Sequence, residues 1–190
     1  FWLSTINNGI DIFDIETKTF NHIYQNSNNP SGLHDDRIYE ILLDANETIW
    51  MGGYTSGVHK LDKGKQKFSI LKYNPSIKKS ISSSSVRSVY LDSKDNIWMG
   101  LDYTGLDIIN RKTQTRSTFN YRKTAEDSTG LRWYTPSQFL EDSRGNIWIA
   151  QGFLGLFHAP DSTFRYFKPN PKDSLKYNHN VMGVLQLDNK

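Results

Sequence analysis

The sequence predicts an all-β protein: a β-propeller segment of about four blades, each a four-stranded antiparallel sheet. Two observations carry this prediction. A tryptophan recurs at intervals of 48, 48 and 50 residues, and a set of short strand patterns recurs with it. Four short strands in a unit of ~40–50 residues are typical of a propeller blade. Such a unit cannot bury its apolar sheet face alone, so neighbouring units must pack against one another.

Three kinds of residue at fixed spacing define the repeat. A glycine stands seven residues after each tryptophan, and an aspartate stands six residues before three of them. We expect the tryptophan to fill the space between blades, the glycine to open the third strand, and the aspartate to sit in a hairpin turn that its side chain stabilises. The structural repeat residues are Trp2, Trp50, Trp98, Trp148, Gly9, Gly57, Gly105, Gly155, Asp44, Asp92 and Asp142.

Within a unit the strands are expected in a constant order. The first is rich in β-branched and aromatic residues, which favour strands, as in 38–43 and 86–91. A polar turn then leads to the second strand, which holds the tryptophan. The third strand starts at the glycine, and a fourth closes the unit. The later strands are expected at 49–52, 97–100 and 147–150, then 57–61 and 105–109, then 67–73, 116–121 and 164–167.

The whole chain, 1–190, is predicted to be one propeller segment with repeats at about 1–48, 49–96, 97–146 and 147–190. It begins on a second strand and ends on a first strand at 181–187, so it is expected to be an excerpt of a larger propeller. An unpaired strand edge tends to find a partner. The spare last strand is therefore expected to pair with the strand of Trp2 or with a neighbouring molecule, the second case giving a homodimer.

Composition excludes several classes of protein. Aromatic residues make up 13% of the chain, which argues against disorder. No apolar run approaches the ~18 residues that a membrane span requires. The absence of cysteine excludes a disulfide framework, thiol catalysis and Cys-ligated zinc. The net charge of +3 is spread along the chain without a Lys/Arg block, so neither nucleic acid nor a membrane is an expected partner.

Catalytic patterns are weak. The five histidines form no metal-ligand pair at helical spacing, and no glycine-rich phosphate loop is present. Ser76 and Lys79 form a Ser-x-x-Lys pattern within a polar loop, and the aspartate turn lacks the Ser and Thr pattern of a sialidase Asp-box. We therefore expect no catalytic residue, metal or cofactor, although the many carboxylates leave a glycosidase-like pair open.

The runs 74–106 and 142–156, including Asp142-Ser143-Arg144-Gly145-Asn146-Ile147-Trp148, carry a specific pattern. This pattern resembles the two-component regulator propeller repeat, and the resemblance covers essentially the whole chain. It implies the periplasmic sensor region of a Bacteroides-type hybrid two-component system, whose propellers are typically seven-bladed. The module itself would be non-enzymatic, with the histidine kinase elsewhere in the receptor and the remaining blades as partners.

In a propeller, the loops from second to third strands and from fourth to next first strands converge on one face. Loops with aromatic and polar groups on a rigid scaffold often bind ligands. The candidate ligand-binding residues are Tyr54, Tyr103 and Phe153 in the first set of loops, and Arg37, Arg87, Trp133, Tyr134 and His179 in the second. Loop packing is the alternative role for the first three, and the start of a first strand is the alternative for Trp133 and Tyr134.

An oligosaccharide is the expected ligand, from the family resemblance first and from loop composition second. Aromatic faces stack on sugar rings while polar side chains bond the hydroxyls. Two other functions stay open: an extracellular propeller enzyme, either a polysaccharide lyase or a glycoside hydrolase, and a protein-interaction scaffold. Convergent acidic residues with shifted pKa values would favour the enzyme, whereas an aromatic-lined cleft without them would favour the sensor.

Overall fold

The computed structural model describes residues 1–26, 28–62, 64, 67–121, 129–167, 181 and 183–185. These residues form fifteen β-strands and no helix, so the prediction of an all-β fold is confirmed. Within the same residues no helix is therefore long and apolar enough to cross a membrane.

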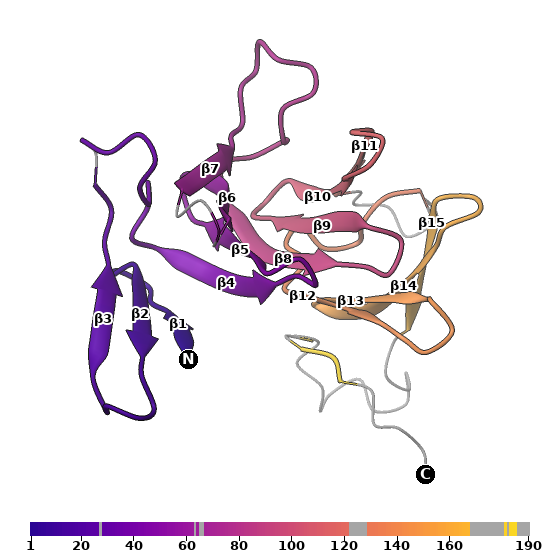
Figure 1. The fold of residues 1–190 in the computed structure, drawn as a ribbon. Helices are drawn as coiled ribbons and strands as arrows, with labels where there is room; N and C mark the ends of the chain where they lie inside the picture. The colour runs from indigo at the N-terminus through magenta and orange to yellow at the C-terminus, as the bar shows by residue number, and fades with distance from the viewer. Residues whose placement is uncertain are drawn as a thin grey trace. The chain divides into compact units, whose positions relative to one another are not determined.

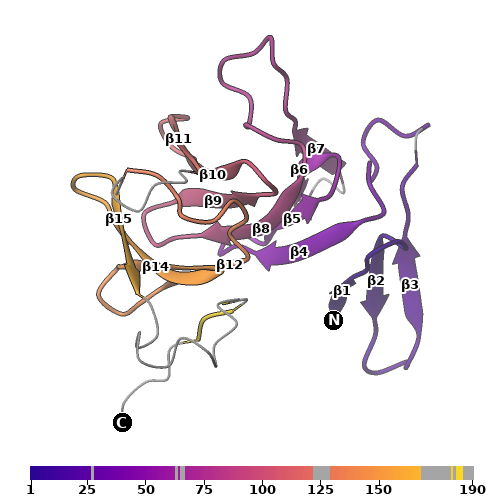
Figure 2. The same ribbon diagram turned by 180° about the vertical axis from the view of Figure 1, so that it is seen from behind.

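The strands of the described residues form four antiparallel sheets, which can be followed in Figures 1 and 2. The strand order in every sheet is the order along the chain, as expected of propeller blades. The first sheet has three strands, β1 (Trp2–Ser4), β2 (Ile10–Phe13) and β3 (Phe20–Ile23). The second has β4 (Ile38–Leu43), β5 (Thr48–Gly53), β6 (Gly57–Asp62) and β7 (Lys67–Leu71). The third has β8 (Val86–Leu91), β9 (Asn96–Leu101), β10 (Gly105–Asn110) and β11 (Arg116–Asn120), and the fourth has β12 (Gln138–Glu141), β13 (Ile147–Gln151), β14 (Phe153–His158) and β15 (Thr163–Phe167).

The chain forms two compact units, Phe1–Val89 and Tyr90–Lys190. In the first unit, the sheets β1–β3 and β4–β7 share a core of aliphatic side chains that includes Ile10, Ile38 and Met51. In the second unit, the core is more aromatic. Phe139 and Phe157 pack against Trp98, with ring centroids 5.9 and 5.1 Å from the indole.

Burial of the repeat tryptophans follows the prediction at two positions of four, because Trp2 is only half-buried and so is Trp148. Trp50 and Trp98 are 5% and 2% exposed. Trp148 is only half-buried and packs against Phe167, 5.5 Å away between ring centroids. It belongs to the sheet β12–β15, and the described residues contain no later sheet that would cover it.

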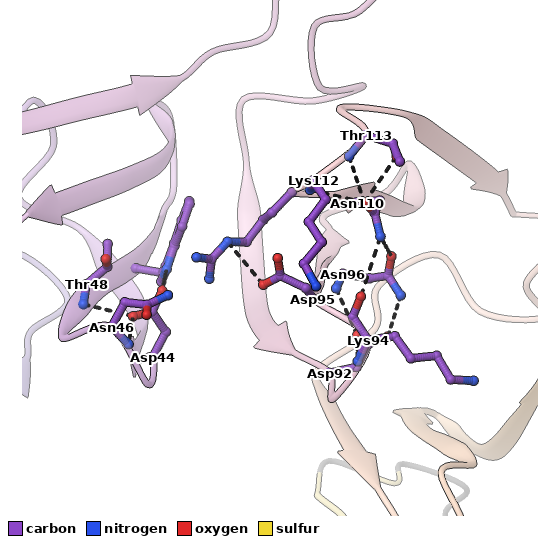
Figure 3. Close-up of polar contacts among 12 residues, drawn as sticks. Asp44, Asn46, Thr48, Asp92, Lys94, Asp95, Asn96, Asn110, Lys112 and Thr113 are labelled. Carbon is purple, nitrogen blue, oxygen red and sulfur yellow. Dashed lines mark hydrogen bonds and ion pairs between the residues drawn. The ribbon is translucent and has the colours of Figure 1, made fainter.

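The repeat aspartate does more than form the turn, because it also bonds the tryptophan of the next strand. The Oδ1 atom of Asp92 accepts the backbone N–H groups of Lys94 and Asn96 at 2.9 and 2.8 Å, and its Oδ2 accepts the Asn96 amide and Trp98 Nε1, both at 2.8 Å. Figure 3 shows Asp92 and Asp44 with the residues of their turns. Asp44 and Asp142 likewise accept the Nε1 atoms of Trp50 and Trp148, at 3.0 and 2.9 Å.

Three of the four repeat glycines have the expected place at the start of the third strand. Gly57 and Gly105 have φ angles of 87° and 130°, and a Cβ atom at either would collide with a carbonyl oxygen of the fourth strand. Gly155 is different and corrects the prediction. It lies inside β14, which begins two residues earlier, and Gly152, with φ 74°, makes the turn instead.

The last predicted strand, 181–187, lies mostly outside the described residues. Val181 exchanges two backbone hydrogen bonds with Gly152, at 3.3 and 3.4 Å. The residues of this segment that the structure describes, 181 and 183–185, are not in a strand. The rest of the predicted strand, and its pairing with that of Trp2 or with a second molecule, lie outside the described residues.

Candidate functional site

The predicted site residues form two groups, one within each unit. Arg37, Tyr54 and Arg87 belong to the first unit, and a set of four aromatic residues, Tyr103, Trp133, Tyr134 and Phe153, belongs to the second. His179 lies outside the described residues. Within each group the side chains are connected through contacts with aromatic rings, in the first unit by way of Tyr39.

In the first unit the side chains form what we call the arginine–tyrosine ladder, made of Arg37, Tyr54, Tyr39 and Arg87. The Arg37 guanidinium carbon lies 4.1 Å from the centre of the Tyr54 ring. The Tyr54 ring meets Tyr39 edge to face, with centroids 5.7 Å apart and planes at 85°. The Arg87 guanidinium carbon lies 4.4 Å from the centre of the Tyr39 ring. Two cation–π contacts thus flank one aromatic pair.

Tyr39 was not among the residues predicted for the site, although the sequence contains a sign of it. Tyr39 and Arg87 each stand eleven residues before a repeat tryptophan, so they occupy the same position of successive repeats. In the structure the pairing of β4 with β5 shifts register between Ile38 and Glu40, which makes Tyr39 the extra residue of a β-bulge. Bulges redirect a side chain, and they are common beside functional sites.

A buried carboxylate holds the loops of the ladder together. Asp35 is 4% exposed and accepts hydrogen bonds from Arg37 N at 3.0 Å, Thr55 N at 2.6 Å and Thr55 Oγ1 at 2.8 Å. Burial acts to raise the pKa of Asp35, but the hydrogen bonds from Arg37 and Thr55 outweigh it and hold the pKa below its ordinary value. The carboxylate therefore stays ionised while it joins the segment before β4 to the loop after β5.

In the second unit the side chains form what we call the aromatic shelf, made of Tyr103, Tyr134, Trp133 and Phe153. Tyr103 stacks on Tyr134 at 5.5 Å and 23°, and Tyr134 stacks on Trp133 at 5.2 Å and 19°. Phe153 meets Trp133 edge to face at 6.2 Å, and Tyr121 meets Tyr134 in the same way at 5.5 Å. Three rings therefore lie nearly parallel, supported by two more.

The structure corrects the predicted position of Phe153 and decides between the two roles left open for Trp133 and Tyr134. Phe153 is not in a loop, because it is the first residue of β14 and pairs with Gln151. Trp133 and Tyr134 do not start a strand, because β12 begins at Gln138. The turn at Gly152 is what lets the indole approach, since a Cβ atom there would lie 2.8 Å from Trp133.

The loop that carries Trp133 and Tyr134 is fastened to the sheet beneath it. The Tyr166 hydroxyl accepts the N–H of Arg132 at 3.2 Å and donates to the carbonyl oxygen of Gly130 at 3.0 Å. Burial raises the pKa of Tyr166 to about 12, so the hydroxyl keeps the proton that it donates. These two hydrogen bonds thus hold in place the loop that carries Trp133 and Tyr134.

Tyr103 forms the outer end of the shelf and is held in an unfavourable backbone conformation. Its side chain is 78% exposed and its φ angle is 58°. A positive φ is uncommon for a bulky residue and costs of order 1 kcal/mol or more. Its N–H donates to Thr135 Oγ1 at 3.2 Å, a bond that ties this turn to the loop of Tyr134.

Two observations on the described residues bear on metal binding and on catalysis. No group of three or more His, Asp or Glu side chains among them is placed to hold a metal. Ser56 Oγ and His59 Nε2 lie 2.5 Å apart, like a nucleophile and its base. However, these residues are 7% and 0% exposed, and His59 Nδ1 has no hydrogen-bond partner within the described chain. The pair is therefore buried within the first unit.

The second unit also contains a cavity of about 380 Å³ at its hairpin turns. Trp98 and Phe157 line its apolar part, and Lys94 and Arg144 line its polar part. None of the predicted ligand-binding residues lies on its wall. The sequence analysis therefore did not anticipate this cavity.

Two solved structures that are similar to the chain are extracellular domains. That of the hybrid two-component system BT3049 from Bacteroides thetaiotaomicron has a TM-score of 0.72 and 23% identity, over 86% of this chain and 21% of that one. That of the hybrid two-component system BT4673 from the same organism has a TM-score of 0.70 and 16% identity, over 95% and 22%. The chain has the fold of these extracellular domains. The resemblance inferred from the repeat is thereby confirmed at the level of the fold.

A third similar structure comes from another kind of system. PorZ, a surface component of the type-IX secretion system of Porphyromonas gingivalis, has a TM-score of 0.63 and 16% identity, over 88% of this chain and 25% of that one. The chain thus spans about a fifth to a quarter of the length of these neighbours. No protein-family model and no curated protein matches the chain.

Proposed function

We propose that this chain is part of the periplasmic ligand-sensing propeller of a hybrid two-component receptor, and that the ligand is an oligosaccharide. The sensor role is supported by the fold, which the chain shares with extracellular domains of such systems. Its proposed protein partners are the other blades of the receptor and a second copy of the chain. The module senses and does not catalyse.

The observation that carries the proposal is the aromatic shelf. Tyr103, Tyr134 and Trp133 form a stack whose outermost ring is exposed, on loops held in place by Tyr166 and Gly152. A sugar ring presents C–H groups on its faces, and these pack well on aromatic rings. Preformed anchors of this kind give affinity because little ordering remains to be done on binding.

Two carboxylates with lowered pKa values, Asp142 and Asp35, support binding over hydrolysis. The pKa of Asp142 falls to about 2 because hydrogen bonds from Asn146 and Trp148 outweigh the opposing effect of burial. The lowered pKa of Asp35 arises in a similar way, from loop hydrogen bonds. Both groups are therefore engaged in structural bonds, whereas a glycosidase needs a pair that faces the scissile bond.

The test is a glycan screen on the complete protein that contains this chain, followed by Trp133→Ala. Loss of the indole should weaken the binding of the best glycan by about tenfold or more, as anchor truncations do. Tyr24→Ala is the matched control, because Tyr24 is an exposed tyrosine outside the shelf and the ladder. Unchanged glycan affinity in a folded Trp133→Ala protein, or no glycan binding at all, would overturn the proposal.

A further inference from the structure

We propose that the arginine–tyrosine ladder binds an anionic group of the saccharide, a carboxylate or a sulfate ester, so that the receptor selects acidic oligosaccharides. The inference rests on the proposed function and narrows the class of ligand. It follows from how the two guanidinium groups are held. One aromatic ring lies against each of them, and within the described residues Arg37 has a single, long ion pair and Arg87 has none.

The position of each guanidinium over a ring determines which of its N–H groups can still donate to a ligand. Arg37 and Arg87 each place the guanidinium carbon close to a ring centre, at 4.1 and 4.4 Å. The N–H groups of a guanidinium lie in its plane, so a ring against the face leaves the edge open. Such an edge offers two parallel N–H donors that match the two oxygens of a carboxylate or sulfate.

The charge of Arg87 is uncompensated within the described residues, where its guanidinium has neither a hydrogen bond nor an ion pair. Arg37 has one ion pair, from Nε to Asp35 Oδ1 at 3.7 Å. Asp35 already accepts three shorter hydrogen bonds from the backbone and from Thr55. The ladder thus contains two positively charged side chains, and the carboxylate that pairs with one of them already accepts three shorter hydrogen bonds.

The ladder is also rigid enough to recognise a ligand. Tyr39 is set by the bulge in β4, and Arg87 extends from β8 at the same repeat position. Tyr54 N donates to the carbonyl oxygen of Arg37 at 3.1 Å, which fixes the two loop members together. An arginine already held against a ring loses less freedom when it binds an anion. The Arg37 side chain remains 39% exposed, so a ligand can reach it.

Calorimetry on the complete protein should compare three probes: an oligogalacturonate, its methyl ester and a sulfated disaccharide. The ester keeps the sugar rings and removes the charge. We expect an anionic probe to bind about tenfold or more tightly than the ester, with the difference shrinking at high salt. Preference for the uronate or for the sulfated sugar tells which anion the ladder takes.

Arg87→Gln should abolish this preference while leaving the weaker binding of the ester. Arg165→Gln is the matched control, because Arg165 also lies over a ring, 5.1 Å from the centre of Phe167, and is not part of the ladder. Equal binding of anionic and neutral probes, unaffected by Arg87→Gln, would overturn the inference and leave the proposed function standing. Absence of binding to every saccharide would overturn both.

Discussion

The ladder of the first unit and the shelf of the second are built largely from corresponding connections of the repeat. The ladder nevertheless presents charged side chains, whereas the shelf presents aromatic rings. In the ladder, two arginines flank two tyrosines, and a buried carboxylate holds the loops. In the shelf, three nearly parallel rings end in an exposed tyrosine with a strained backbone. The comparison teaches that the repeat sets where loops emerge, while a few loop residues decide whether charge or apolar surface is presented.

The largest effect is expected in the core of the second unit, which also carries the shelf. Trp98→Ala should lower the free energy of unfolding by about 3–5 kcal/mol, as truncation of buried aromatic residues does. Trp148→Ala should cost clearly less, because Trp148 is half-buried. Urea denaturation measures both. Equal costs at the two positions would contradict the difference in burial.

The stability of the two units should respond to acid in different pH ranges. Burial lowers the pKa of His59 to about 4, with the charge of His34 adding to the effect. Its folded pKa lies below the ordinary value, so its contribution to stability is complete above about pH 6.5 and is lost as the pH falls towards 4, at most about 3 kcal/mol. Asp142 acts in a lower window: its contribution is present above about pH 4 and is lost towards pH 2.

The pH range set by His59 applies to the unit that contains the ladder, and the range set by Asp142 applies to the unit that contains the shelf. Thermal melts between pH 7 and pH 4.5 should show stability falling in the wild type and a flatter profile in His59→Gln. An identical decline in both proteins would remove His59 as the cause.

Gly152→Ala should damage the shelf without touching the ladder. The new Cβ atom would lie 2.8 Å from the Trp133 ring, at a backbone φ of 74° that alanine adopts poorly. We expect a loss of about 1–2 kcal/mol in stability, mainly from the strained φ, together with weaker glycan binding. Chemical denaturation and calorimetry on the same sample measure the two effects. A variant as stable as the wild type, with full glycan affinity, would show that the close approach of Trp133 is unimportant.

The smallest stability effect is expected at Tyr103. Tyr103→Gly relieves a positive φ, which should offset the added freedom of the unfolded chain, so the stability should change by less than about 1 kcal/mol. Tyr103→Ala should likewise leave the melting temperature nearly unchanged. Both variants should weaken glycan binding, because the exposed ring is gone. If stability falls and affinity is kept, Tyr103 is a packing residue.

Much of the fold could be predicted because its determinants are local. Tryptophan spacing, β-branched runs and turn residues each act within a few residues, and they placed strands such as β4 and β8 at their observed bounds. The same local analysis predicted Trp133, Tyr134, Tyr103 and Phe153 as site candidates from their residue types and their expected loop positions. It could not tell which rings touch.

The sequence by itself determined the repeat, the strand order and the glycine positions at 9, 57 and 105, because periodicity, strand propensity and a required positive φ are properties of short segments. Only the tertiary structure decided that Tyr39 joins Arg87, that Phe153 lies in a strand, and that the repeat aspartate bonds the tryptophan indole. These contacts depend on a bulge, on a shortened turn and on side chains brought together by strand pairing. Such features arise from the path of the backbone in space and leave little trace in the local pattern.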